Sequence, residues 1–221
     1  MLYEKLKFGA VFVLSLGLTA ISAQTVTDID GNSYTTVTIG TQSWMGSNLK
    51  TTRYRNGDLI GTTSFPTKDI RGENSPKYQW AYDGKESNVA TYGRLYTWYA
   101  TTDSRGVCPV GWHVPADAEW SILTTFLGGE IVAYSKLKEA GEFHWIKYDT
   151  GTNETGFTAL PGGIRNSRGP FDDIGSSCNW WSSTELSAYE AWYRQMNYNS
   201  SIVFRYPYLK RNGFSVRCIK N

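Results

Sequence analysis

The sequence predicts an α+β domain, in which two helices pack on short antiparallel strands joined by long loops. Composition is the first indication, because the 221 residues include 22 Gly, 15 Tyr, 9 Trp and 9 Phe, which is typical of many turns and large packing units. Residues 26–45 alternate β-forming residues with turn signals such as Asp30-Gly31-Asn32, as hairpins do. Apolar residues recur at helical spacing only later, and short strands and loops follow them.

The first 23 residues have the pattern of a cleavable secretion signal. Lys5 and Lys7 precede an uncharged apolar run over residues 8–21, and the small residues Ser22 and Ala23 follow it. The run is shorter than the roughly 20 residues that a helix needs to cross a bilayer, so a retained anchor is the less favoured alternative. We expect cleavage after Ala23 and no membrane span in the mature chain. No cysteine lies at that junction, so a lipid anchor is not indicated.

Residues 24–221 are predicted to form a single domain, because no later stretch resembles a second hydrophobic helix or a low-complexity linker. A formal charge of +2 is too small for the dense cationic face of a protein that binds nucleic acid without sequence preference. The expected location is therefore the periplasm, the cell surface or the medium, and nucleic acid is not an expected partner.

The helices are expected in the middle of the chain. Residues 92–101 place apolar side chains at helical spacing and favour a helix, although their β-branched and aromatic content leaves a strand open. A short strand is predicted over residues 111–114. The first main helix should cover residues 115–127, with Asp117 and Glu119 favouring its N-terminus, and the second should cover residues 131–140. Trp112, Trp120 and Trp181 are predicted to lie in the core.

The cysteines predict one disulfide. Cys108, Cys178 and Cys218 allow three pairings, and an exported protein should have one pair oxidised. Cys218 shares a strand face with apolar residues by period two, and Cys108 lies in a segment that continues to the apolar Trp112. Cys178 lies in a polar, turn-like run. We therefore predict a Cys108–Cys218 disulfide and leave Cys178 as a free thiol.

Little in the sequence indicates catalysis or a metal centre. His113 and His144 are interpreted as structural, since no common hydrolase, zinc or phosphate-binding motif includes them. The acidic pair Asp172-Asp173 and Glu185 are the best candidates for acid–base chemistry or calcium, but solvated loop residues are the favoured reading. Residues 28–32 superficially resemble a calcium loop and lack its distal glutamate, so a turn is expected. We predict no metal, no cofactor and no enzymatic activity.

Residues 108–120, which read CPVGWHVPADAEW, give the chain a resemblance to the Fibrobacter succinogenes major paralogous domain family. Further matching stretches are residues 92–96, 155–163, 180–185 and 213–218. The resemblance implies an exported bacterial protein with a C-type-lectin-like fold, in a family whose biochemical role is poorly defined. Ala116 stands where the family usually has Thr or Ser, which should weaken the helix start by roughly 1 kcal/mol. Cys178 stands where the family usually lacks cysteine, in keeping with a free thiol.

That fold leaves two alternative functions open. Calcium-dependent lectins use carboxylate and amide ligands in a stretch that here reads Trp180-Trp181-Ser182-Ser183, which disfavours calcium. Residues 213–218 are also similar to the closing strand of formylglycine-generating enzymes, which use cysteine thiolates to hold copper or carry out the oxidation. The one cysteine in that strand is predicted to be in the disulfide, so an oxidoreductase is the weaker hypothesis.

A ligand-binding surface is expected within residues 193–212. Tyrosine, serine and asparagine dominate this interval as they do in antibody paratopes, and it contains four cationic and no acidic residues, which favours an anionic or aromatic-stacking partner. Period two predicts that Trp192, Arg194 and Met196 face the domain and that alternate residues face outward. The predicted ligand-binding residues are Tyr193, Gln195, Asn197, Tyr198, Tyr206, Tyr208 and Arg211.

The expected partner is an extracellular protein or glycan. The same interval also resembles the variable region that diversity-generating retroelements rewrite in some C-type-lectin-like proteins. The alternative is that its aromatic residues are ordinary surface strand residues without a ligand.

Overall fold

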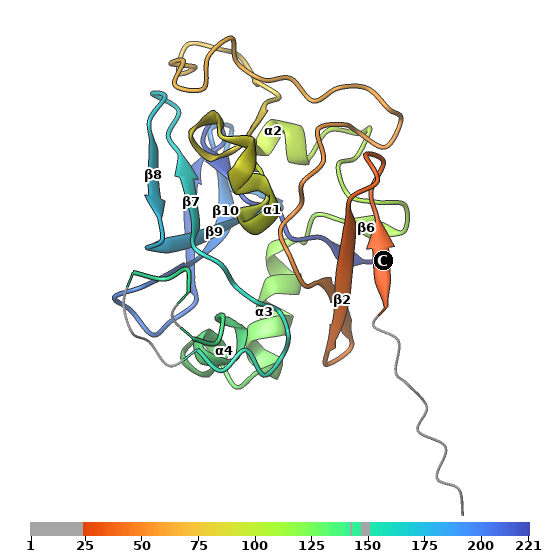
Figure 1. Cartoon of the computed structure of the whole chain (residues 1–221), viewed down its shortest axis with the longest axis vertical. Coiled ribbons are helices and arrows are strands. Elements are labelled where there is room, and N and C mark those ends of the chain that lie inside the picture. Colours follow the sequence, from red (N-terminus) through yellow and green to blue (C-terminus); the bar gives the residue numbers. More distant parts are fainter. Residues whose placement is uncertain (1–23, 142, 147–150) are drawn as a thin grey trace, which may run out of the picture.

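A computed structural model of the chain describes residues 24–141, 143–146 and 151–221, so the predicted secretion signal lies outside the described residues. The structure is an α+β domain, as predicted, with mostly antiparallel strands and a few short helices (Figure 1). No helix in the described ranges has the length and apolar character needed to span a membrane.

Both ends of the described chain meet in the first sheet. Its strands are β1 (Thr25–Thr27), β2 (Ser33–Ile39), β3 (Gln42–Met45), β6 (Trp112–His113) and β13 (Ile219–Lys220). They lie in the order β1-β2-β3-β13-β6 with antiparallel pairing throughout. Asp28 accepts hydrogen bonds from the backbone N–H groups of Asp30 and Asn32, so residues 28–32 form the expected turn.

A second sheet contains the segment in which binding is expected. Its strands are β9 (Ser177–Glu185), β10 (Glu190–Asn197) and β11 (Phe204–Leu209), with β10 in the centre and both pairings antiparallel. The third sheet comprises β4 (Gln79–Trp80), β5 (Leu95–Thr97), β7 (Gly162–Arg165), β8 (Phe171–Ile174) and β12 (Gly213–Phe214). These strands lie in the order β4-β5-β12-β7-β8.

The two main helices lie where the sequence pattern predicts them, whereas the helix predicted over residues 92–101 is not present. Helices α3 (Asp117–Phe126) and α4 (Glu130–Leu137) follow each other closely in space as well as in sequence (Figure 1). The remaining helices are single turns: η1 (Tyr82–Gly84), η2 (Glu86–Asn88), α1 (Val89–Tyr92) and α2 (Trp98–Thr101).

The helix predicted over residues 92–101 is therefore wrong. Strand β5 occupies its middle, because Tyr96 and Thr97 pair with β12, and the helical residues of this range are Tyr92 at the end of α1 and the turn α2. Helix α4 also ends earlier than predicted. Lys138 takes an extended conformation there and forms a bridge with Ala159, which ends the helix at Leu137.

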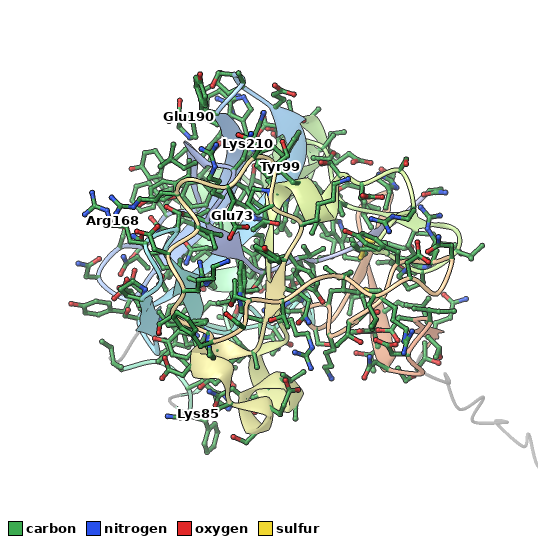
Figure 2. All side chains as sticks on the ribbon, turned by 90° about the horizontal axis from the view of Figure 1, so that it is seen from above. Glu73, Lys85, Tyr99, Arg168, Glu190 and Lys210 are labelled. Atoms are coloured by element: carbon green, nitrogen blue, oxygen red, sulfur yellow. A yellow bond between two sulfur atoms is a disulfide. The ribbon has the colours of Figure 1, made fainter. Side chains whose placement is uncertain are left out.

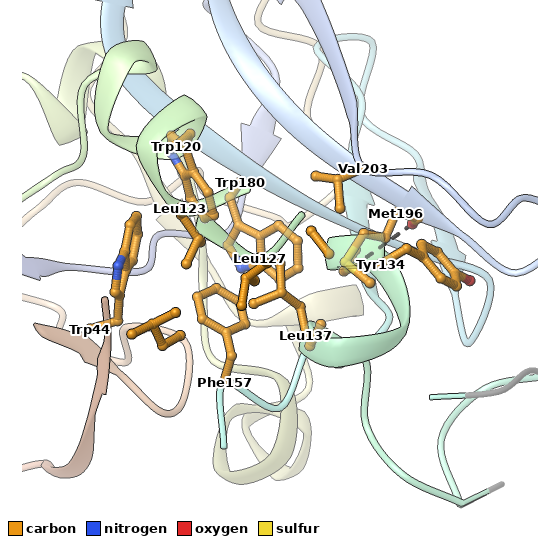
Figure 3. Close-up of a cluster of buried hydrophobic side chains, with 14 of the residues drawn as sticks. Trp44, Trp120, Leu123, Leu127, Tyr134, Leu137, Phe157, Trp180, Met196 and Val203 are labelled. Carbon is orange, nitrogen blue, oxygen red and sulfur yellow. Dashed lines mark hydrogen bonds between the residues drawn. The ribbon is translucent and has the colours of Figure 1, made fainter. Parts of the chain in front are cut away.

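An aromatic core lies between α3, α4 and the second sheet (Figure 3). The rings of Trp44 and Trp120 are 4.8 Å apart, those of Trp120 and Trp180 are 5.8 Å apart, and Phe157 contacts Trp180 edge-on. A second cluster contains Trp112, and a third contains Trp181. The prediction that Trp112, Trp120 and Trp181 belong to the core is confirmed.

The disulfide is the predicted one. Cys108 and Cys218 are bonded, and both are buried in the second cluster. Cys178 is the free cysteine, but its predicted polar setting is wrong: it lies in β9 within the aromatic core, where burial raises the pKa of its thiol. The neighbouring Ser177 and Asn179 are buried as well.

Candidate binding surface

The strands β10 and β11 form a hairpin whose two faces differ. Opposed residues of an antiparallel pair project to the same face, and the register pairs Tyr193 with Tyr206 and Gln195 with Phe204. We call this side, with Tyr208, the tyrosine face. Arg194 projects to the other side, opposite Arg205 and toward α3. The predicted alternation of the two sets is therefore present in the fold.

Tyr193 is on the predicted side of the strand but does not reach solvent. Its ring centre lies 4.7 Å from that of Phe214 and 6.4 Å from that of Trp181, and only 6% of the residue is exposed. Phe214 belongs to β12 of the third sheet, which covers this part of the tyrosine face. The prediction of an outward, ligand-contacting Tyr193 is therefore wrong, and burial raises the pKa of its hydroxyl.

Tyr206 and Tyr208 are the exposed tyrosines of this face, at 43% and 36%. The ring of Tyr206 is stacked on that of Phe204, with 5.2 Å between centres and 18° between planes. Tyr208 contacts Tyr193 and Phe214 at 5.8 Å and 5.6 Å. Both exposed rings are thus held in place by aromatic neighbours, so little rotamer freedom remains to be lost when a ligand binds.

Gln195, Asn197 and Tyr198 lie at the other end of the hairpin. The side-chain amide of Gln195 donates to Asn179 Oδ1 at 3.0 Å, and the backbone carbonyl of Asn197 accepts from the hydroxyl of Tyr134 at 2.9 Å. Tyr198 is half-buried against the aromatic core. These predicted site residues are engaged with the domain, and the structure does not bring them together with Tyr206 and Tyr208.

The opposite face of the hairpin is occupied by charge pairs. Arg194 is buried and bonds Asp117 of α3 at 2.5 Å, and Met196 is part of the core, as predicted. Arg205 pairs with the same carboxylate at 2.9 Å and lies 3.4 Å from the centre of the Trp192 ring. Trp192 is therefore only half-buried, beneath a guanidinium group, and its predicted place in the domain interior is wrong.

Only part of the positive charge of residues 193–212 is available to a ligand. Lys210 is 2% exposed; its ammonium donates to the carbonyl of Ser187 at 2.6 Å, pairs with Glu185 and lies 4.4 Å from the centre of the Trp98 ring. Arg211 differs, because it is half-exposed and lines a pocket.

This pocket has a volume of about 360 Å³ and adjoins the tyrosine face at Tyr208. Its walls come from three separate segments of the chain: residues 67–73, the loop between β7 and β8, and the end of β11. The lining residues are Arg71, Asn166, Ser167, Arg168, Tyr208, Leu209, Arg211 and Asn212. Figure 2 shows Arg168 projecting from the edge of the domain.

The sequence indicated Tyr208 and Arg211 but missed the other arginines of the pocket. Arg71 and Arg168 lie in polar loops without an aromatic pattern, far from Arg211 in the sequence. The hydrogen bond from the backbone N–H of Ser167 to Asn212 Oδ1, at 2.8 Å, joins two of the pocket walls across 45 residues. Only the fold brings the two arginines beside Tyr208, so no local signal in either loop could have identified them.

The other candidates for chemistry lie outside the lining of this pocket. His113 contacts Glu119 at 2.9 Å, and His144 contacts Glu139 at 2.7 Å. Asp172 and Asp173 lie in β8, where burial, with a smaller contribution from Asp172, raises the pKa of Asp173. Within the described ranges, no three His, Cys, Asp or Glu residues gather as metal ligands would.

Comparison with known proteins identifies the family. Residues 37–220 match the family described as the Fibrobacter succinogenes major domain. Neither the curated proteins nor the solved structures contain a match. The match covers most of the sequence and every element from the end of β2 to β13, and the chain therefore belongs to the Fibrobacter succinogenes major domain family.

Proposed function

We propose that this protein is an exported, non-catalytic binding or adhesion module with a C-type-lectin-like fold, which recognises an extracellular protein or glycan. The observation that carries the proposal is the pair of exposed rings of Tyr206 and Tyr208, which are fixed on a buried aromatic base formed by Tyr193 and Phe214. Rigid tyrosines give a large contact area at low entropic cost, which is how many recognition surfaces are built.

The disulfide supports export. A bond between Cys108 and Cys218 persists in the periplasm or outside the cell and is rare in a reducing cytosol. The apolar N-terminal run after Lys5 and Lys7 supplies a matching route across the membrane. We infer a secreted, periplasmic or surface protein from these two observations together.

The fold proposal rests on the family resemblance and on the arrangement of the elements. Strand β13 lies between β3 and β6, so the last described strand shares a sheet with the first three, and α3 and α4 pack against the second sheet. This arrangement is compatible with a C-type-lectin-like domain, in which long loops and short strands carry the ligand site.

The cysteines and the Trp180–Ser183 stretch favour binding over the alternatives. Cys218 is oxidised, and Cys178 lies in the core, where its raised pKa keeps it in the unreactive thiol form. The stretch Trp180-Trp181-Ser182 is buried within β9 and does not present ligands to a calcium ion at the surface.

The test is an array of glycans and extracellular proteins probed with residues 24–221, with and without calcium. The probes are the wild-type chain, the variant Tyr206→Ser/Tyr208→Ser, and Phe143→Ser as a control that removes another exposed aromatic side chain outside the hairpin. We expect ligands that are retained by the control, lost by the double variant and unaffected by removal of calcium. Ligands bound equally by all three proteins would refute the proposed surface.

A further inference from the structure

The pocket beside Tyr208 combines three guanidinium groups with no acidic lining residue. Arg71, Arg168 and Arg211 come from different segments and converge on one hollow of about 360 Å³. A space of this size lies within the range of small-molecule sites and accommodates one or two sugar or amino-acid units, but no folded element. The charge of the walls favours an anionic group in the ligand.

Two of the guanidinium groups keep donors free for a ligand, and one of them, that of Arg211, is also held in position. Arg211 donates through Nε to the backbone carbonyl of Glu73 at 2.8 Å, while its terminal NH₂ groups make no hydrogen bond with any described residue. The backbone N–H of Arg168 donates to Asn166 Oδ1 at 2.9 Å. The exposed guanidinium of Arg168 makes no hydrogen bond or ion pair with any described residue.

The third guanidinium is already paired. Arg71 binds Asp69 through Nε and a terminal nitrogen, the latter at 2.7 Å, and this contact lowers the pKa of Asp69 to about 2. Asp69 thus compensates one of the three positive charges at all ordinary pH values. The remaining two belong to Arg168 and Arg211, whose planar NH₂ donors fit the two oxygens of a carboxylate.

The lining between the arginines indicates a hydroxylated ring as the carrier of that carboxylate. Tyr208 forms part of the wall and is 36% exposed, so its ring offers a surface for stacking. Asn166, Ser167 and Asn212 also line the pocket; Ser167 and Asn212 are almost fully buried, so the half-exposed Asn166 is the one that offers an amide to a ligand. An aromatic ring, a neutral amide and a carboxylate-binding fork together match a sugar acid better than an aliphatic acidic side chain.

The sheet edge beside the pocket disfavours an extended peptide. β11 is an edge strand of its sheet, where a peptide could add as a further strand. Pro207 lies in the middle of β11 and lacks a backbone N–H, and the charged Arg205 precedes it by two residues. Both features block strand addition at exposed sheet edges, so recognition here depends on side chains.

We propose that this pocket binds a uronic acid unit of an acidic polysaccharide, with the carboxylate between Arg168 and Arg211 and the sugar ring against Tyr208. The inference rests on the proposed function and narrows its ligand to one class. Tyr206 and Phe204 continue from Tyr208 along the hairpin, so neighbouring sugar units of the same chain lie along the tyrosine face.

Calorimetric titration of residues 24–221 with oligogalacturonate tests this. Methyl-esterified oligogalacturonate removes the charge but keeps the ring, and polyglutamate keeps the carboxylates but removes the ring. We expect saturable binding of oligogalacturonate alone. Arg168→Gln/Arg211→Gln should weaken it at least about tenfold, because charge-assisted hydrogen bonds to a carboxylate are lost. Lys85→Gln, which removes an exposed cation elsewhere on the domain (Figure 2), should bind like the wild type.

The single variant Arg168→Gln guards against misfolding, because that exposed side chain makes no hydrogen bond or ion pair with a described residue and acts on Asp69 only through its charge; its melting temperature should stay close to that of the wild type. Equal binding of oligogalacturonate and polyglutamate, or binding that survives the double arginine substitution, would overturn the inference. Failure of the proposed function is a separate result: array ligands that depend on Tyr206 and Tyr208 but carry no carboxylate leave that function standing and refute only the uronate.

Discussion

Tyrosine side chains on one face of the hairpin differ in exposure, because residues of another sheet cover some of them and not others. Tyr193 and Tyr206 are direct cross-strand partners, yet the first is 6% and the second 43% exposed. Phe214 covers Tyr193, and no described residue covers Tyr206 to the same degree. Replacing Tyr193 therefore tests core packing, whereas replacing Tyr206 tests the proposed ligand contact.

Tyr193→Ser should destabilise the fold by about 3 kcal/mol, in the range found when a buried aromatic side chain is truncated. Tyr206→Ser should cost about 1 kcal/mol or less, since it loses a partly exposed stacking contact with Phe204. Chemical denaturation of the two variants measures the difference. A larger loss for Tyr206 than for Tyr193 would contradict the assignment of Tyr193 to the core.

The sequence predicted which hairpin residues share a face, because period two is a property of the strand alone. It could not predict that Tyr193 is covered, since the covering ring of Phe214 comes from another sheet. For the same reason it missed Arg71 and Arg168 of the pocket. A local sequence pattern predicts to which side of a strand a side chain points, whereas the exposure of that side chain depends on contacts between distant segments.

A single carboxylate, that of Asp103, should make the stability of the domain depend on pH. Its carboxylate accepts hydrogen bonds from Arg105 at 2.9 Å and pairs with Lys77 at 2.7 Å, and these cations, Arg105 above all, hold its pKa well below the usual range. A carboxyl group with a pKa lowered by folding adds stability above its unfolded pKa of about 4, and that stability is lost as the pH falls further.

Asp103→Asn should therefore lower the free energy of unfolding at pH 7 and reduce its decline between about pH 5 and pH 2, because the carboxyl that loses its partners on protonation is gone. Urea unfolding at a series of pH values measures both effects. Parallel pH profiles of variant and wild type would exclude Asp103 as a contributor to acid unfolding.

At the scale of elements, the start of α3 shows how a missing cap is replaced. Ala116 has no side chain that can accept a hydrogen bond, so a weak helix start was expected. The Thr184 hydroxyl of β9 accepts from the backbone N–H of Asp117 at 2.9 Å, and Glu119 accepts from the backbone N–H of Ala116 at 2.7 Å. A neighbouring strand and the first turn of the helix together satisfy donors that a local cap normally serves.

Thr184→Val keeps the shape of the side chain and removes the acceptor, so it should destabilise the domain by about 1 to 2 kcal/mol. Thr184→Ser retains the hydroxyl and should lie closer to the wild type. Denaturation midpoints of the two variants provide the comparison. Equal midpoints would mean that Thr184 contributes packing alone and that α3 begins without help from β9.

The helix predictions succeeded where the chain carries end signals and failed where tertiary pairing decides. Helix α3 has acidic residues in its first turn and the glycines Gly128 and Gly129 after its end, and the structure matches the prediction within two residues at each side. Residues 92–101 have no such signals. Their apolar spacing fits a helix, but Tyr96 and Thr97 gain ladder partners in β12 and become strand β5 instead.

At the scale of the whole molecule, the first sheet joins the two ends of the described chain, and the disulfide ties the last strand to the middle of the chain. β13 pairs with β3 and β6, and Cys218, directly before β13, is bonded to Cys108, shortly before β6. Loss of order in either terminal segment would therefore disturb the sheet that contains both. The β10–β11 hairpin lies between Cys108 and Cys218 in the sequence, so the disulfide closes the loop that contains it.

Removal of the disulfide should weaken the whole domain. The bond closes a loop of 110 residues, and restricting the unfolded chain over such a loop stabilises a protein by about 4 kcal/mol in the chain-entropy model. Cys108→Ala/Cys218→Ala should lower the free energy of unfolding by up to that amount, whereas Cys178→Ala, which removes only a buried sulfur, should cost about 1 kcal/mol. Guanidinium unfolding measures both.

Unfolding in the presence of reductant distinguishes the stability that comes from the disulfide bond from the stability that comes from packing of the two cysteine side chains. Strong reductant should shift the unfolding midpoint of the wild type and of Cys178→Ala toward that of the double variant, and leave the double variant unchanged. Thiol counting on the unfolded, unreduced wild type should give a single reactive group, and none in Cys178→Ala. If the wild type unfolded at the same guanidinium concentration with and without reductant, the disulfide would have no part in the stability of the domain. The pairing of β13 with β3 and β6 would then be what keeps the C-terminal strand in the first sheet.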